Sequence, residues 1–103
     1  MLDIKLDSEY EDLDKYKISE DYVYFKKNTN IIHNPYGAAI IGEDGFKGYW
    51  IENKLHRLDG PARIFPDGKE EYWINSKRLS KKQFEVDPER FKLLGKEHLI
   101  CLL

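Results

Sequence analysis

Two histidines are the residues of this chain best suited to metal binding or proton transfer, and they lie 23 positions apart, at 33 and 56. As shown below, this spacing is also the period of a repeat. Equivalent positions in neighbouring hairpins of a sheet lie about 10 Å apart, whereas two nitrogen ligands of one zinc ion must lie within roughly 4 Å. We therefore expect His33 and His56 each to hydrogen-bond the backbone of a nearby turn.

Two other groups of residues could carry chemistry. His56, Arg57 and Asp59 could serve acid–base or nuclease catalysis, but Asp59 precedes Gly60-Pro61 and fits a turn equally well. His98 and Cys101 offer two metal ligands without a second pair. The sequence has no nucleophile elbow, phosphate-binding loop or paired metal carboxylates. We predict a non-enzymatic protein with no catalytic residues, no metal and no cofactor.

The histidines begin two consecutive copies of a 23-residue unit. Residues 33–55 and 56–78 carry the same residue type at ten equivalent positions, which include an Asp-Gly pair and a Tyr-Trp-Ile run. A fixed period of this size is typical of repeat units that bury apolar surface only by stacking on one another.

Each unit reads as a β-hairpin with its Asp-Gly pair at a two-residue turn. Aromatic and β-branched residues flank the turns, as strands prefer. A shorter match, from Tyr24 to Asn28, predicts an earlier half-unit. The expected strands span residues 22–28, 38–41, 49–52, 62–65 and 72–75.

A two-residue turn at Asp67-Gly68 pairs Phe65 with Glu70 and sorts the side chains onto two faces. One face would carry Ala62, Ile64 and Trp73, which we expect to form the core together with the equivalent residues of the preceding unit. The other face is apolar but varied, and it is the candidate partner-binding surface. Its residues are Tyr49, Ile51, Arg63, Phe65, Tyr72 and Ile74.

Helix signals replace the repeat at Ser80. Ser80 and Gln83 have the spacing of a capping box, and Leu79 and Phe84 stand at the flanking staple positions, so a helix is expected at 81–86. Asp87-Pro88 predicts a second helix start. Gly95 is its expected end, and the apolar tail from His98 to Leu103 is expected to be packed, as a strand or a buried end.

These signals predict a mainly β domain with a C-terminal helix. The fold class is an antiparallel β-hairpin repeat meander of about five or six strands, capped by one or two short helices. The expected segments are an acidic lead-in at 1–21, the repeat array at 22–79, and a helical cap with an apolar tail at 80–103.

Composition limits the partners. The net charge is −2, which favours neither nucleic acid nor a membrane, although residues 1–22 hold eight acidic and three basic side chains. The single cysteine fits a reducing compartment. No signal peptide precedes the array, and no apolar run approaches the ~18 residues of a membrane helix. We expect a cytoplasmic protein that does not bind membranes.

The runs Tyr49-Trp50-Ile-Glu-Asn53-Lys-Leu-His56-Arg-Leu-Asp-Gly60-Pro-Ala62 and Pro66-Asp-Gly68 resemble MORN-type repeats in a variant form, as does the exit from Lys77 into a helix. The resemblance covers about residues 33–86. It departs from the variant where Asn53 and Ser76 lack the usual glycine, and where Pro35-Tyr36 stands in place of Leu58-Asp59. Such units look typical of small proteins of bacteriophages and large DNA viruses.

MORN-type proteins are mostly scaffolds and binders, so the resemblance implies a protein-binding module. The leading hypothesis is a phage protein that binds and inhibits a host protein, such as a defence nuclease, in the host cytosol. The alternative is a nucleic-acid-directed protein, either a single-strand binder through a ladder of Phe25, Trp50 and Trp73 or an acidic mimic through residues 1–22. Open strand edges also make a homodimer by edge pairing a candidate assembly.

Overall fold

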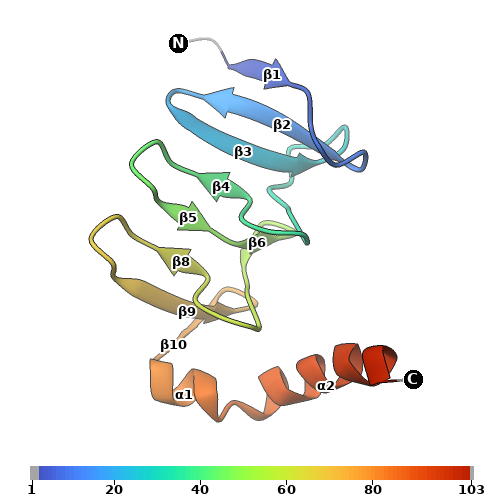
Figure 1. The fold of residues 1–103 in the computed structure, drawn as a ribbon, viewed down its shortest axis with the longest axis vertical. Helices are drawn as coiled ribbons and strands as arrows, with labels where there is room; N and C mark the ends of the chain where they lie inside the picture. Colours follow the sequence, from blue (N-terminus) through green and yellow to red (C-terminus); the bar gives the residue numbers. More distant parts are fainter. Residues whose placement is uncertain (1–2, 103) are drawn as a thin grey trace.

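The computed structural model describes residues 3–102, and for residues 96–102 it describes the backbone alone. Short strands follow one another and lead into two C-terminal helices (Figure 1). The strands are β1 (Ile4–Leu6), β2 (Leu13–Ile18), β3 (Asp21–Lys26), β4 (Ile40–Ile41), β5 (Lys47–Gly48), β6 (Trp50–Ile51), β7 (Lys54–Leu55), β8 (Arg63–Ile64), β9 (Glu70–Ile74) and β10 (Lys77–Leu79). The helices are α1 (Lys81–Glu85) and α2 (Pro88–Leu102).

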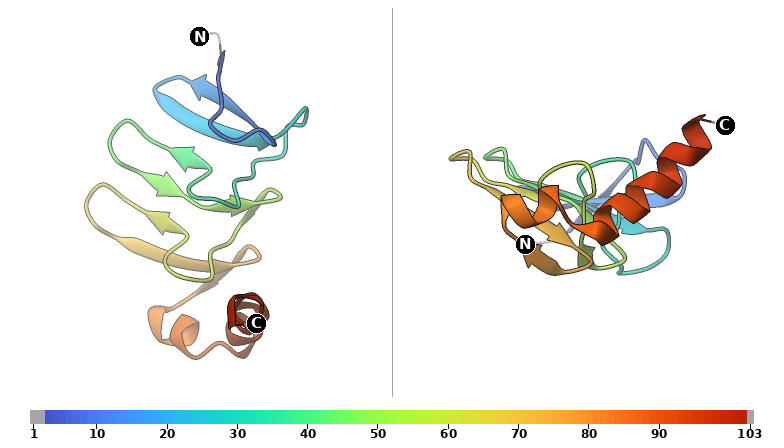
Figure 2. Two further views of the ribbon diagram at one scale, coloured as in Figure 1. Left: turned by 45° about the vertical axis from the view of Figure 1, so that its right-hand side comes forward. Right: turned by 90° about the horizontal axis from the view of Figure 1, so that it is seen from below.

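Eight of these strands form one antiparallel sheet in the order β1-β2-β3-β4-β5-β8-β9-β10, and β6 pairs with β7 separately. The predicted fold class, an antiparallel hairpin meander with C-terminal helices, is confirmed. The sheet is larger than the five or six strands expected. Figure 2 shows the hairpins stacked side by side in a thin twisted layer, and the whole chain measures 43 × 35 × 19 Å.

The sheet begins earlier than predicted, because β1 and β2 lie inside the segment expected to be an acidic lead-in. In β2, Leu13 is buried, and the buried Asp14 accepts a hydrogen bond from the backbone N–H of Asn28 at 2.8 Å. The expected half-unit is present, since Tyr24 donates its N–H to the Ala39 carbonyl as Tyr49 does to Ala62.

The hairpin turns contain three residues rather than two. The N–H of Phe65 bonds the Lys69 carbonyl at 2.9 Å, and Gly68, with φ of +91°, donates to the Phe65 carbonyl at 2.9 Å. Pro66 and Asp67 therefore fill the central positions of a turn that the glycine closes, a three-residue hairpin geometry. The first unit forms the same loop, where Gly45 has a φ of +98°.

The extra loop residue moves the register by one position, so Arg63 opposes Glu71 and Ile64 opposes Glu70. A one-residue shift moves every side chain of one strand to the other face relative to its partner strand. The predicted pairing of Phe65 with Glu70 is therefore wrong. Trp73 shares a face with Arg63, and Tyr72 shares the opposite face with Ile74.

Each unit also contains a second hairpin that the sequence did not reveal. Two-residue turns with positive φ, at Glu52-Asn53 and Asn75-Ser76, reverse the chain after β6 and β9. Positive φ at both central positions is the geometry of the favoured hairpin turn. The residues predicted to end the second strands of the units instead make these turns.

The repeated histidines hold these turns. Nδ1 of His33 accepts the N–H of Glu52, and Nδ1 of His56 accepts the N–H of Asn75, both at 3.0 Å. The expectation that each histidine bonds turn backbone is confirmed. In the turn after β3, the N–H of Asn28 bonds the Asp14 carboxylate. The histidine that begins each unit therefore holds the turn near the end of that unit.

The C-terminal cap begins as predicted. Ser80 and Gln83 form a capping box, and Phe84 is buried with Leu79 and Ile74. The N–H of Glu89 bonds Asp87 at the start of α2. The helix continues through Gly95 to Leu102, so the predicted end at Gly95 is wrong. One glycine costs a helix only about 1 kcal/mol, and the Lys and Glu that follow favour helix. The side chains of the tail, including His98 and Cys101, lie outside the described residues.

We predict that His56→Ala lowers the free energy of unfolding by about 1–3 kcal/mol, because it leaves the Asn75 N–H without its acceptor. His56→Asn should retain most of the stability, since a side-chain amide oxygen can reach the place of Nδ1. Urea unfolding followed by circular dichroism measures both. Equal losses in the two variants would contradict the assignment.

We also predict that stability falls between pH 7 and pH 5 because of His33. Burial, together with the nearby Lys26, lowers the pKa of His33 below its ordinary 6.5. The unfolded chain then binds more protons, so this contribution is complete above about pH 6.5 and is lost as the pH falls through the lower folded-state pKa. The pH dependence of unfolding in that window should flatten in His33→Asn. The carboxyls with lowered pKa, such as Asp14, titrate at lower pH.

Candidate functional site: an open aromatic face

One face of the sheet carries half-buried aromatic rings around an arginine. We name it the open face and define it by Phe46, Trp50, Arg63, Phe65, Glu71 and Trp73. A Cβ added at Gly48, which opposes Arg63, would meet the Trp50 indole and the Phe46 ring. Both rings therefore lie on the face that carries Arg63. The Phe46 and Phe65 rings meet edge to face at 5.4 Å, and Arg63 lies 5.2 Å from the Phe65 ring centre.

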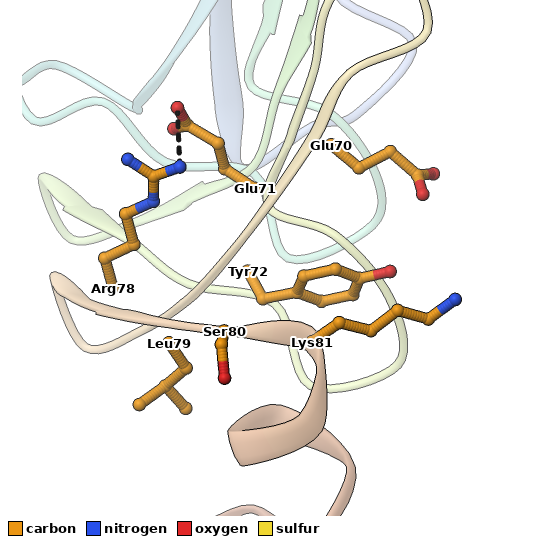
Figure 3. Close-up of a pocket in the computed structure, with 7 residues that line it drawn as sticks. All are labelled: Glu70, Glu71, Tyr72, Arg78, Leu79, Ser80 and Lys81. Carbon is orange, nitrogen blue, oxygen red and sulfur yellow. Dashed lines mark ion pairs between the residues drawn. The ribbon is translucent and has the colours of Figure 1, made fainter.

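Glu71 organises the polar part of the open face. Its carboxylate accepts a hydrogen bond from the Trp73 indole at 3.0 Å and pairs with Arg63 at 3.3 Å and Arg78 at 3.6 Å. Figure 3 shows Glu71 and Arg78 facing each other on one side of β9, while Tyr72 leaves the strand in another direction. The Glu71 carboxylate thus restrains the guanidinium groups of Arg63 and Arg78 and the Trp73 indole. This cluster carries two positive charges and one negative charge.

The opposite face carries three tyrosines at equivalent positions, and we name it the tyrosine face: Tyr24, Tyr49 and Tyr72. Elements outside the sheet pack against it. Tyr72 contacts the Phe84 ring of α1 at 4.7 Å, and Tyr24 meets Tyr10 at 5.8 Å. The described side-chain contacts of the helices with the array fall on this side, including Arg90 with the Leu58 carbonyl at 2.7 Å. The cap therefore leaves the open face uncovered by its described side chains.

The predicted partner-binding residues do not form one surface. Arg63 and Phe65 lie on the open face, whereas Tyr72 and Ile74 lie on the opposite side of β9. Tyr49 and Ile51 line a cavity on the tyrosine side. Ile74 is 4% exposed and belongs to the core, so it cannot contact a partner. The expected tryptophan core is also wrong, because Trp50 and Trp73 are only half-buried.

Sequence reasoning missed Phe46 and Glu71, and its leading hypothesis placed Trp50 and Trp73 in the core rather than on the binding face. One signal could have found them: in Phe65-Pro66-Asp67-Gly68, proline and glycine stand at the second and fourth positions of a four-residue turn, where they favour the turn observed here. A three-residue loop gives the correct register, and the register then assigns the faces.

The candidate catalytic residues His56, Arg57 and Asp59 make structural contacts. Arg57 donates Nε–H to Asp59 at 2.9 Å and Nη1–H to the Pro61 carbonyl at 3.1 Å, and His56 holds the turn at Asn75. Buried Asn34, at the position equivalent to Arg57, bonds the Ala38 carbonyl in the same way. These contacts close the loop that joins two units. Within residues 3–102, the side chains described bring no three histidine, cysteine, aspartate or glutamate residues together as a metal site.

Shifted pKa values also belong to contacts between elements. Burial and the hydrogen bond to Glu9 raise the pKa of Tyr24, and that hydrogen bond lowers the pKa of Glu9. A hydrogen bond from Lys26 to Glu52 lowers the pKa of Glu52. These groups hold the early part of the array together, so their shifts point to no reaction.

Comparison with known proteins yields no match: no family model, no curated protein and no solved structure is similar to this chain. Among the described residues, no helix is long and apolar enough to cross a membrane. The case for function therefore rests on the faces of the sheet.

The two faces should respond differently to truncation. We predict that Ile74→Ala lowers the free energy of unfolding by about 2–5 kcal/mol, because it opens a cavity beside Leu79 and Phe84. Phe65→Ala, on the open face, should cost less than half as much. Urea unfolding of both variants measures the difference, and a greater loss for Phe65→Ala would place the core on the other face.

Proposed function

We propose that this protein is a non-enzymatic binding module whose open face receives a partner protein. The supporting observation is the set of half-buried Trp, Phe and Arg side chains on a face that the described parts of the helices leave uncovered. These residue types dominate the energetic centres of protein interfaces. The contacts of Glu71 with Arg63 and Trp73 restrain two of them before binding, which reduces the entropy lost on association.

The partner class that we propose comes from the resemblance to viral MORN-type variants. In this proposal the partner is a host protein, such as a defence nuclease, which the module binds and inhibits in the cytosol. The chain supplies no catalytic machinery in this mechanism. Inhibition follows from covering a surface that the host protein needs.

Single-stranded nucleic acid is a second candidate ligand. The observation that favours it is that Trp50 and Trp73 are half-exposed on the same face as Arg63, since bases stack on aromatic rings beside cationic groups. The acidic-mimic alternative is less favoured, because Asp14 and Glu9 are held by contacts within the fold.

We predict that the double variant Arg63→Ala/Phe65→Ala weakens partner binding at least tenfold while the fold persists. Truncation of residues at an interface centre costs about 1–2 kcal/mol or more each. The matched control is Val86→Ala, an apolar residue that is 70% exposed and lies beyond α1, and it should bind as the unchanged protein does. Tagged proteins used for affinity capture from host extract, followed by titration with the captured protein, measure these affinities.

Equal capture by all three proteins would contradict the open-face proposal. Quenching of tryptophan fluorescence by oligothymidine, weakened by salt and lost in the double variant, would instead support the nucleic-acid candidate. Far-UV circular dichroism and the melting temperature show whether each variant retains its fold.

A further inference from the structure

The middle tyrosine of the tyrosine face is covered differently from its two neighbours. An aromatic ring from outside the sheet packs on each outer tyrosine: Tyr10 on Tyr24 at 5.8 Å, and Phe84 on Tyr72 at 4.7 Å. Tyr49 instead lies under the guanidinium of Arg57, at 4.0 Å. The tyrosines of the flanking units thus show that this face of the repeat tyrosine accepts an aromatic ring.

A cavity of about 620 Å³ opens beside Tyr49. Its apolar walls are Tyr36 and Ile51 from the repeat units, Leu58 from the joining loop and Leu94 from α2, and its polar walls include Asn34, His56 and Asp59. Tyr36 is 57% exposed, and its ring stacks on Tyr10 at 4.7 Å, so the segment between β1 and β2 fixes its position. This volume accommodates a single large side chain with room for water.

Arg57 forms a rigid, charge-compensated surface of the cavity. Its Nε–H bonds the Asp59 carboxylate and its Nη1–H bonds the Pro61 carbonyl, which fixes the plane of the guanidinium. A side chain at Gly60 would come within 3.1 Å of the Arg57 guanidinium carbon, so glycine leaves room for that plane. Because Asp59 balances its charge, Arg57 favours a neutral planar group over an anion.

We infer that this cavity is a socket for one aromatic side chain of a partner protein, which packs beside Tyr49 and the Arg57 plane as Phe84 packs on Tyr72. The two flanking units, where the chain itself supplies the ring, support an aromatic occupant. In the middle unit Arg57 covers Tyr49, so the partner's ring packs beside that guanidinium. The site lies on the side of the sheet opposite the open face, so it does not depend on the proposed function of that face.

N-acetyl-phenylalanine amide is the probe for the test, with N-acetyl-leucine amide as its matched aliphatic control. A ligand of this size in a preformed, partly apolar site should bind with a Kd on the order of 1 mM. In ¹H–¹⁵N NMR titrations we expect saturable shifts at the amides of Gly37, Ile51 and Leu58, and at least threefold weaker binding of the leucine probe.

Gly37→Leu should abolish these shifts, because Gly37 lines the cavity and a Cβ there would meet nothing within 4 Å, so the leucine can enter without strain. Lys69→Leu, at an exposed hairpin turn, is the control for added apolar surface and should bind the probe normally. Tyr36→Ala removes an exposed wall and should weaken binding at least threefold, which keeps the test decisive if Gly37→Leu fails to fold.

The inference is overturned if the shifts do not saturate, if both probes bind equally, or if binding survives both cavity variants. Arg63→Ala/Phe65→Ala should leave probe binding unchanged. Loss of partner capture in that variant with normal probe binding would separate the open face from the socket, and failure of the socket would leave the capture result as it stands.

Discussion

The array depends on a side-chain acceptor at the start of each unit that holds the turn near the end of the same unit. Asp14, His33 and His56 hold the turns at Asn28, Glu52 and Asn75 in succession. Each bond satisfies a turn N–H that a two-stranded hairpin would leave to water. Two-stranded hairpins are marginal by themselves, and this contact couples each one to its neighbour. Both histidines act through Nδ1 as acceptors, so the repeat position uses the imidazole as a hydrogen-bond acceptor.

This coupling explains why a thin sheet can be stable. Few side chains are fully buried, and two of them are Ala39 and Ala62, each 0% exposed at the same repeat position. Small residues there bring neighbouring units into close contact, and the rings on both faces remain only partly covered. The tyrosine face gains its cover from Tyr10, Arg57 and Phe84, each supplied by a different segment. A sheet of this kind keeps a second face available for binding without the loss of its core.

Much of the fold was predictable because the repeat unit occurs twice, so each copy supports the interpretation of the other. Equivalent residues at a fixed offset identified the Asp-Gly hairpins and the role of His33 and His56, and the capping-box spacing of Ser80 and Gln83 identified the helix start. The faces were not predictable from the Asp-Gly signal alone, because it fits loops of two and three residues, and a single residue decides which side of the sheet each ring occupies. The sheet's early strands were missed because β1 and β2 are rich in charge, and Asp14 is buried there only because the Asn28 N–H compensates it.

The cap shows how one repeat position can have two outcomes. Asn34 and Arg57 each send a side chain to a loop carbonyl and return the chain to the next strand. Ser80 stands at the same position after the second unit, but its hydroxyl accepts the Gln83 N–H in a capping box. The chain therefore turns into α1, and Phe84 is delivered to Tyr72. The array ends where a helix cap replaces the side chain that closes the loop. The same change places Phe84 on Tyr72, whereas Tyr49 in the middle unit is covered by Arg57.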